Sequence, residues 1–165
     1  MRIRKAIYSI SFAALFGFGL SPAFGLSLAG PPTHKVILKR AELVEGHRYP
    51  AGTELTVYDH SGKVVYVQLG GNVHMNGHMI LRGTRMYMRD GKPVSYFSVP
   101  GQKINGILLP KDAQVGFNKE GRLHTIHLPS GTKIRSGGKT YAGNQWIFFD
   151  AHGKVIPEEQ AESLY

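Results

Sequence analysis

Two His-Met pairs, four residues apart, are the part of this sequence best suited to metal chemistry. Residues 73–80 read VHMNGHMI, so His74 and Met75 are followed by His78 and Met79. Soft thioether sulfurs select Cu(I), and imidazole nitrogens also suit copper ions. The pattern therefore indicates one candidate site, for copper or silver, built from these four side chains.

A repeat that runs through the chain gives the same residues a simpler explanation. One series of turn glycines consists of Gly62, Gly91, Gly121 and Gly153. A second series consists of Gly46, Gly77, Gly106 and Gly137. Successive members of each series are 29 to 32 residues apart, and self-similarity at such a period indicates stacked structural units. We therefore predict four units, at residues 42–69, 74–99, 103–128 and 133–156.

Alignment of the four units decides how most of the methionines should be interpreted. Met75, Met86 and Met88 all align with Val, Leu or Ile in other units. Because Met is flexible and fills irregular gaps in cores, we predict that these three side chains are buried. His74 and Met79 remain unexplained by the repeat, so the metal site is kept as the alternative.

Short runs rich in Val, Ile, Tyr, Phe and Thr lie between Gly and Pro turns, and helical periodicity is nearly absent. This alternation predicts an all-β domain of hairpins. We expect an antiparallel meander of four repeats of ~30 residues, with about twelve strands in total. A small closed β-barrel is the structural alternative, because long open sheet edges must be covered.

The N-terminus has the three parts of a secretory signal peptide: basic residues, the apolar run Ile7–Leu20, and small residues. The run is too short to span a membrane, which takes about 20 residues. We expect cleavage before Leu26 or Gly30 and an exported chain, periplasmic or extracellular. The expected divisions are a signal peptide at 1–25, a lead-in at 26–41, the β-repeat domain at 42–156 and a polar tail at 157–165, which frays or forms a short helix from Pro157.

The composition and motifs of the chain exclude several kinds of catalytic chemistry. The chain has no cysteine, which excludes disulfides and thiol catalysis. No catalytic motif is present, and His124 and His127 should point to opposite faces of a regular strand. Trp146, Phe148 and Phe149 share one predicted strand, and we interpret them as a hydrophobic plug rather than a ligand-stacking platform. We therefore predict no enzymatic activity and no cofactor, and we expect no nucleic-acid partner.

A basic residue follows the turn glycine of every unit: these residues are Lys63, Lys92, Arg122 and Lys154. If the units stack in register, the four cations form a row along one side of the sheet. Such a row would suit an anionic envelope surface, where each cation contributes about 1 kcal/mol. The alternative is that these residues are merely exposed after a turn and protect the sheet from edge-to-edge association.

The segment KTYAGNQWIFFDAHGKV, residues 139–155, resembles the MORN-type β-hairpin repeats, with Tyr-x-Gly before a strand and a Gly turn after it. MORN units are shorter than the period here, and Tyr-x-Gly is missing from the second and third units. The resemblance covers residues 42–156 and implies an extended antiparallel sheet that binds proteins or lipid surfaces, without catalytic residues. We expect an exported, non-enzymatic binding or structural module of the bacterial envelope, whose partner is an anionic surface or a protein. An envelope enzyme or a copper- or silver-binding protein is the alternative.

Overall fold

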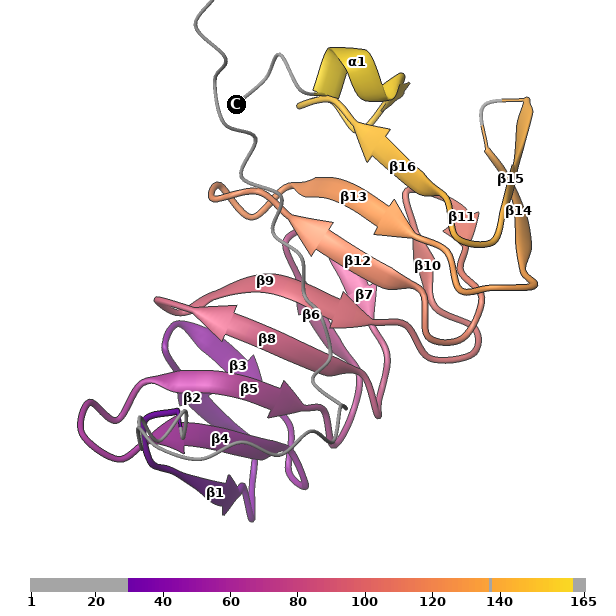
Figure 1. Cartoon of the computed structure of the whole chain (residues 1–165). Coiled ribbons are helices and arrows are strands. Elements are labelled where there is room, and N and C mark those ends of the chain that lie inside the picture. Colours follow the sequence, from indigo (N-terminus) through magenta and orange to yellow (C-terminus); the bar gives the residue numbers. More distant parts are fainter. Residues whose placement is uncertain (1–29, 137, 162–165) are drawn as a thin grey trace, which may run out of the picture.

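The computed structural model describes residues 30–136 and 138–161, which form two layers. One layer is an antiparallel sheet of nine strands, and the other is a row of four two-stranded hairpins. In Figure 1 the first three hairpins lie behind the sheet and the last stands at its right. The predicted fold class, an all-β antiparallel meander of hairpin repeats, is thereby confirmed. The sheet is open, because β1 and β17 lie at opposite ends of the strand order. The predicted signal peptide and both cleavage sites lie outside the described residues.

The strands alternate between the two layers along the chain. In spatial order, the large sheet contains β1 (Thr33–Ile37), β4 (Glu54–Tyr58), β5 (Val64–Gln68), β8 (Arg85–Arg89), β9 (Lys92–Phe97), β12 (Gln114–Phe117), β13 (Leu123–His127), β16 (Trp146–Phe149) and β17 (Val155–Ile156). The small hairpins are β2 (Glu42–Val44) with β3 (His47–Tyr49), β6 (Val73–Met75) with β7 (His78–Ile80), β10 (Lys103–Ile104) with β11 (Ile107–Leu108), and β14 (Lys133–Ser136) with β15 (Lys139–Ala142).

Each repeat unit thus consists of one small hairpin followed by one large hairpin. This arrangement gives 17 strands among the described residues, more than the sequence indicated, because the small hairpins use strands of only two to four residues. One short helix, α1 (Glu158–Ala161), follows the last strand. No helix in the described part of the chain has the length and apolar character needed to cross a membrane.

The first three small hairpins turn through two residues with positive φ, a backbone geometry that matches the twist of the flanking strands. In the second unit these residues are Asn76 at 50° and Gly77 at 79°. In the fourth unit the predicted glycine series is wrong by one residue. Ser136 pairs with Lys139 across its turn, and Gly138, at 77°, rather than Gly137, takes the place of Gly77.

The core lies between the two layers, and one row of its residues crosses the large sheet from strand to strand. Paired residues of successive large-sheet strands point toward the small hairpins, and each is at most 3% exposed: Leu55, Val67, Met86, Tyr96, Val115, Ile126 and Ile147. The predicted burial of the three methionines is confirmed, since Met75, Met86 and Met88 are 4%, 0% and 6% exposed.

A pair of backbone hydrogen bonds recurs where one unit joins the next. Leu69 N–H donates to the Thr84 carbonyl at 3.0 Å, and Gly83 N–H donates to the Leu69 carbonyl at 2.8 Å. Leu38 makes the same two bonds: its N–H donates to the Thr53 carbonyl at 3.0 Å, and its carbonyl accepts from Gly52 N–H at 2.8 Å. Leu38, just after β1, therefore has the same role in the first unit as Leu69 has in the second. Residues 33–38, predicted as part of the lead-in, therefore belong to the sheet.

The C-terminal end of the stack is built differently from the rest. Strand β17 pairs with β16 through only two residues and stops before Pro157, after which α1 begins. Ala161 of α1 is 1% exposed, and Phe149 is 2% exposed, as expected for a plug. Trp146 does not belong to this plug, because it is 47% exposed.

Candidate functional site

The four residues of the predicted metal site lie on one small hairpin but do not converge. His74 pairs with Met79, and Met75 pairs with His78, across β6 and β7. Met75 is buried in the core, whereas Met79 is 48% exposed. Burial, followed by the nearby charge of His74, lowers the pKa of His78 below its ordinary value. In the described residues, no three His, Asp or Glu side chains gather as metal ligands would.

The predicted basic row does lie along one side of the sheet, at the turns of the large hairpins. Two of its members are directed to the next turn in the row. Lys63 Nζ lies 2.6 Å from Asp90 Oδ1, and Lys92 Nζ donates to the Lys119 carbonyl at 3.2 Å. The Lys63 ammonium holds the pKa of Asp90 below its usual value. The row thus connects neighbouring units.

The remaining two cations differ in their surroundings. Arg122 lies 3.8 Å from Glu120 of its own turn. The side chain of Lys154 forms no salt bridge among the described residues, although its backbone N–H donates to Asp150 Oδ1 at 2.9 Å and thereby lowers the pKa of that carboxyl. Each of the four turns carries one carboxylate, from Asp59, Asp90, Glu120 and Asp150. Arg89 and Lys119 add two further cations to these turns, so the turn side of the sheet keeps a net positive charge.

The face of the large sheet that points away from the small hairpins carries two rows of side chains across the strands. Register places Glu54, Gln68, Arg85, Phe97, Gln114, His127 and Trp146 in one row. It places Lys35, Thr56, Tyr66, Tyr87, Ser95, Gly116, Thr125 and Phe148 in the other. We call this surface the open face, and it mixes aromatic rings with hydrogen-bonding groups.

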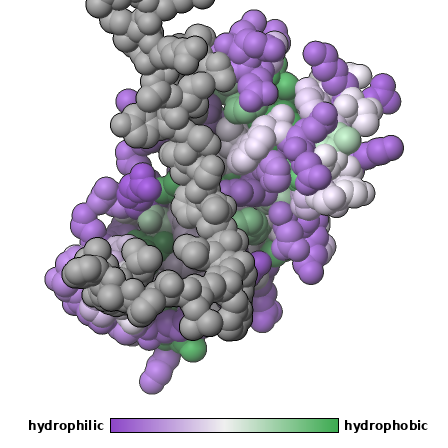
Figure 2. Space-filling view, viewed as in Figure 1, coloured by the Kyte–Doolittle hydropathy of each residue, from purple (hydrophilic) through white to green (hydrophobic). Residues whose placement is uncertain are grey.

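Three aromatic rings on neighbouring strands form a cluster on the open face. The ring centroids of Tyr66 and Tyr87 lie 5.3 Å apart, edge to face, and those of Tyr87 and Phe97 lie 6.4 Å apart. Tyr87 is 47% exposed, so the cluster is accessible. With Val65 and Val94, the rings line a hollow of about 670 Å³. Figure 2 shows hydrophobic residues between hydrophilic borders where this side of the molecule is uncovered.

Bulges bring additional side chains to the hollow. In the first three units, the large hairpin has one extra residue on its second strand: Val65, Val94 and His124. Strict alternation therefore fails at these positions, and the sequence-based assignment of His124 and His127 to opposite faces does not apply to a strand with a bulge. Burial lowers the pKa of His124.

Two cations of the open face, Lys35 and Arg85, are compensated locally, whereas Arg89, which lines the hollow, forms no salt bridge among the described residues. Lys35 Nζ lies 2.7 Å from Glu54 Oε1 in the neighbouring strand, and this contact raises the pKa of Lys35. The Arg85 guanidinium lies 5.9 Å from the centre of the Phe97 ring and 4.0 Å from Asp112. Burial raises the pKa of Tyr66, so that its hydroxyl remains a neutral hydrogen-bonding group near pH 7.

The sequence indicated the strands of the open face but not its aromatic cluster. Tyr66, Tyr87 and Phe97 alternate with core residues of the same strands, and that alternation was the available signal. Comparison with protein-family models gives no match. Neither characterised proteins nor solved structures give a match. The geometry of the described residues is therefore the basis for assigning a function.

Proposed function

We propose that the protein is an exported, non-enzymatic binding module of the bacterial envelope, and that it binds an uncharged glycan chain across its open face. The observation that carries the proposal is the accessible cluster of Tyr66, Tyr87 and Phe97, which lines a hollow of about 670 Å³. Small-molecule and oligomer sites commonly have hollows of roughly 300–1,000 Å³ with apolar walls and a few polar groups.

The open face offers contacts both for the apolar C–H groups of a sugar ring and for its hydroxyls. The C–H groups of a pyranose can stack on aromatic rings, while its hydroxyls require hydrogen-bond partners when water is displaced. Gln68, Gln114 and His127 supply such partners, and they occupy the same cross-strand row as Phe97. Strands about 4.8 Å apart present these groups at intervals similar to the length of one sugar unit.

Local charge compensation favours a neutral polymer over a charged one. Lys35 is paired with Glu54, and Arg85 lies between Phe97 and Asp112. An anionic polymer would gain little from cations that already have partners, since exposed pairs contribute only about 0–1 kcal/mol. A neutral glycan requires no unpaired charge on the open face.

The glycan proposal is tested by affinity electrophoresis through gels that contain individual neutral polysaccharides. We expect retardation in at least one gel and a loss of affinity of tenfold or more in Tyr87→Ala, because this ring is half exposed and contributes stacking area. Leu108→Ala is the matched control, since Leu108 is 57% exposed on the opposite layer. Equal retardation of both variants, or no retardation in any gel, would reject the proposal.

A second candidate is that the row of Lys63, Lys92, Arg122 and Lys154 docks the protein on an anionic envelope surface. The placement of all four residues at one side of the sheet favours it. The test compares binding to anionic vesicles and lipopolysaccharide by the protein and by a variant with Gln at all four positions. A salt-sensitive loss in the variant supports docking, whereas unchanged binding identifies these residues as connections between turns.

Export has an independent test. We expect mass spectrometry of the protein from its native host to find a mature N-terminus at Leu26 or Gly30. Recovery of intact chain starting at Met1 from the cytosol would contradict export without affecting the glycan proposal.

A further inference from the structure

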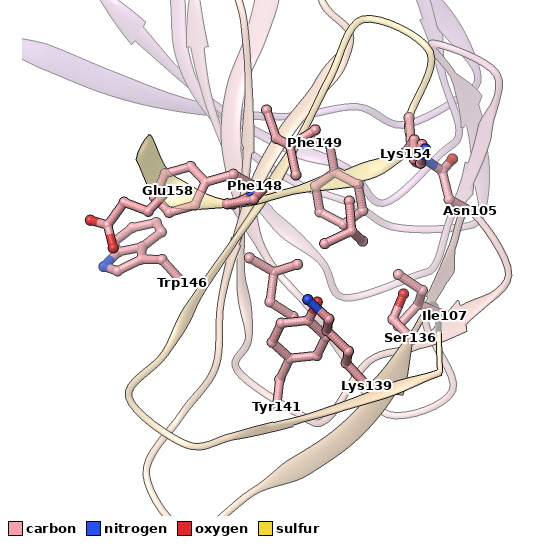
Figure 3. Close-up of a pocket in the computed structure, with 15 residues that line it drawn as sticks. Asn105, Ile107, Ser136, Lys139, Tyr141, Trp146, Phe148, Phe149, Lys154 and Glu158 are labelled. Atoms are coloured by element: carbon pink, nitrogen blue, oxygen red, sulfur yellow. The ribbon is translucent and has the colours of Figure 1, made fainter. Parts of the chain in front are cut away.

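A hollow of about 470 Å³ opens at the C-terminal end of the stack, between the two layers. Figure 3 shows Phe149 at its centre, with Tyr141 and Lys139 on one side and Lys154 near Asn105 on another. Ile147 and Phe149 of this hollow are 1% and 2% exposed, so its inner wall is continuous with the core. The hollow therefore borders the interlayer core on one side, and Trp146 and Phe148 of the open face line it on the other.

The repeat explains why this space is closed elsewhere. In the first unit, His47 Nε2 lies 2.7 Å from the carbonyl oxygen of Gly91, in the large-hairpin turn of the second unit. In the third unit, Asn105 Nδ2 donates to the Gly153 carbonyl of the fourth unit at 3.5 Å. Each small hairpin thus reaches the next large hairpin. After the fourth unit the described residues continue with α1, which packs on β16, and the hollow lies beside the start of this helix.

The rim of the hollow carries more positive than negative charge. Lys139 comes from the small hairpin, and Lys154 comes from the turn before β17, so the two ammonium groups belong to different layers. Neither side chain forms a salt bridge among the residues that the structure describes. Glu158 lies beside Trp146, on the other side of the hollow from Lys154 (Figure 3).

We propose that this hollow binds a single-chain amphipathic anion, such as a fatty-acid carboxylate, with its tail between the layers and its head group at Lys139 and Lys154. The partly exposed side chains of Tyr141, Val155 and Ile156 offer apolar surface to an acyl chain. The two cations, which have no salt-bridge partner among the described residues, suit one carboxylate or phosphate. The volume lies within the range of small-ligand pockets, roughly 300–1,000 Å³. This proposal does not depend on glycan binding by the open face.

The charges and the backbone favour such a ligand over a second copy of the chain stacked end to end. At the opposite end of the stack, Lys35 and Arg40 are already paired with Glu54 and Glu42. Lys39 forms no salt bridge among the described residues, so this end offers a further cation to the two lysines of the hollow. Strand pairing is also prevented, because β17 stops before Pro157, whose nitrogen carries no proton.

Trp146 gives a direct measurement, because it lines the hollow and is the only tryptophan in the chain. We expect its fluorescence to change in a saturable, one-to-one manner when the purified protein is titrated with dodecanoate below its micelle concentration. Decanoate should bind about fifteenfold more weakly, because each methylene contributes about a factor of four. Dodecyltrimethylammonium, with the same tail and opposite charge, should not compete.

Two charge-matched double variants test the head-group contacts. Lys139→Gln/Lys154→Gln should weaken dodecanoate binding at least tenfold. Lys103→Gln/Lys133→Gln removes the same charge from exposed positions outside the hollow and should leave binding unchanged. Circular dichroism of both variants establishes that they are folded, so that a loss of binding reports on the site.

Four outcomes would overturn the proposal: absence of a saturable fluorescence change, equal binding by both double variants, equal binding of the cationic amphiphile, or interaction only with phosphatidylglycerol vesicles. The last outcome would identify adsorption to lipid head groups rather than insertion of one chain. Sedimentation velocity provides a further check. Concentration-dependent association that is abolished by Ile107→Arg, without dodecanoate binding, would assign the hollow to a second copy.

Discussion

Equivalent residues in different repeats have different hydrogen-bonding partners, and the buried threonines illustrate this at the scale of single residues. Thr53 and Thr84 occupy the same position in the first and second units, and both are 0% exposed. Thr53 Oγ1 accepts a hydrogen bond from Gly70 N–H at 3.1 Å. Thr84 Oγ1 has no hydrogen-bond partner in the described part of the chain. One hydroxyl therefore stabilises the fold, whereas the other is buried at a cost.

We predict that Thr84→Val stabilises the protein and that Thr53→Val destabilises it. Removing an unsatisfied buried hydroxyl should raise the free energy of unfolding by about 1 kcal/mol, whereas leaving Gly70 N–H unsatisfied should lower it by about 1–3 kcal/mol. Urea unfolding of the two variants measures both values. Because the substitutions are chemically identical, effects of the same sign would contradict this account.

The half-buried His78 of the second unit should make stability depend on pH. Burial and the His74 charge lower the pKa of His78 in the folded chain below the ordinary value of 6.5. Below pH 6.5 the unfolded chain binds a proton that the folded chain does not, so stability present above this pH is lost as pH falls. The carboxyls of Asp90 and Asp150 have pKa values below 3.8 and therefore act at more acidic pH.

The measurement is the urea midpoint between pH 7.5 and 5.5. We expect the midpoint to fall across this range in the unmodified protein and to fall less in His78→Gln. His152→Gln, in an exposed turn, is the control and should retain the full dependence. An identical pH dependence in His78→Gln would contradict the assignment to His78.

At the scale of secondary-structure elements, the two edge strands of the large sheet differ in how they end. Strand β1 has five residues, all exposed, and among the described residues it pairs only with β4. Strand β17 has two residues and is followed by Pro157 and α1. Alignment places Pro157 where β5 carries Val67, a core residue. A proline at this position ends pairing and protects the edge of β16.

We predict that Pro157→Val lengthens β17 and promotes self-association. Valine restores the N–H that an edge strand needs, and it favours extended backbone. Analytical ultracentrifugation should show larger species for Pro157→Val than for the unmodified protein at equal concentration. Pro157→Gly, which restores the N–H but disfavours a strand, should associate less than the valine variant. Monomeric Pro157→Val would show that α1 alone protects this edge.

At the scale of the whole molecule, the stack is a linear array in which each unit meets only its neighbours in the sheet. The backbone pair that joins Leu69 to Thr84 recurs from Ser98 to Ala113, where Ser98 N–H donates at 2.9 Å. Leu69 and Ser98 are 29 residues apart and occupy equivalent positions. Stability in such arrays is approximately a sum of unit and interface contributions.

We therefore predict that deletion of residues 70–98 yields a folded protein one unit shorter. Leu69 can then pair with Ala113 as Ser98 does, so the register of both layers is kept. Circular dichroism should retain the β-sheet spectrum, and the urea midpoint should fall because one interface is lost. Deletion of residues 70–83, about half a unit, breaks the register and should not fold. Similar behaviour of the two deletions would contradict the linear array.

The fold could be predicted from sequence because its turns are chemically explicit. The glycine spacing indicated the repeat, and alignment of Met86 with Leu55 indicated burial, which the structure confirms. The division into two layers was not predicted, because strands of two to four residues are too short for their alternation to be recognised. Strand β1 was missed because its partner, β4, lies about twenty residues away in sequence.

The candidate sites were harder to predict than the fold. The basic residues that follow the turn glycines could be recognised from sequence, but the contact of Lys63 with Asp90 depends on the spacing between units. The aromatic cluster depends on cross-strand register between Tyr66 and Tyr87, and that register is shifted by bulges elsewhere in the same hairpins. The C-terminal hollow arises because α1, rather than another hairpin, packs on the fourth unit, and no single residue type indicates this.

The unequal edges of the large sheet also limit how many copies can join by strand pairing. The number of edges available for pairing is the valence of the molecule. A molecule with two open edges is divalent and can polymerise into a fibre. Among the described residues, Pro157 cuts the strand at one of these edges short, which leaves β1 as the one full-length position for adding a strand. A monovalent molecule that pairs β1 with β1 of another copy has no edge left, so the growth of the sheet ends at a dimer.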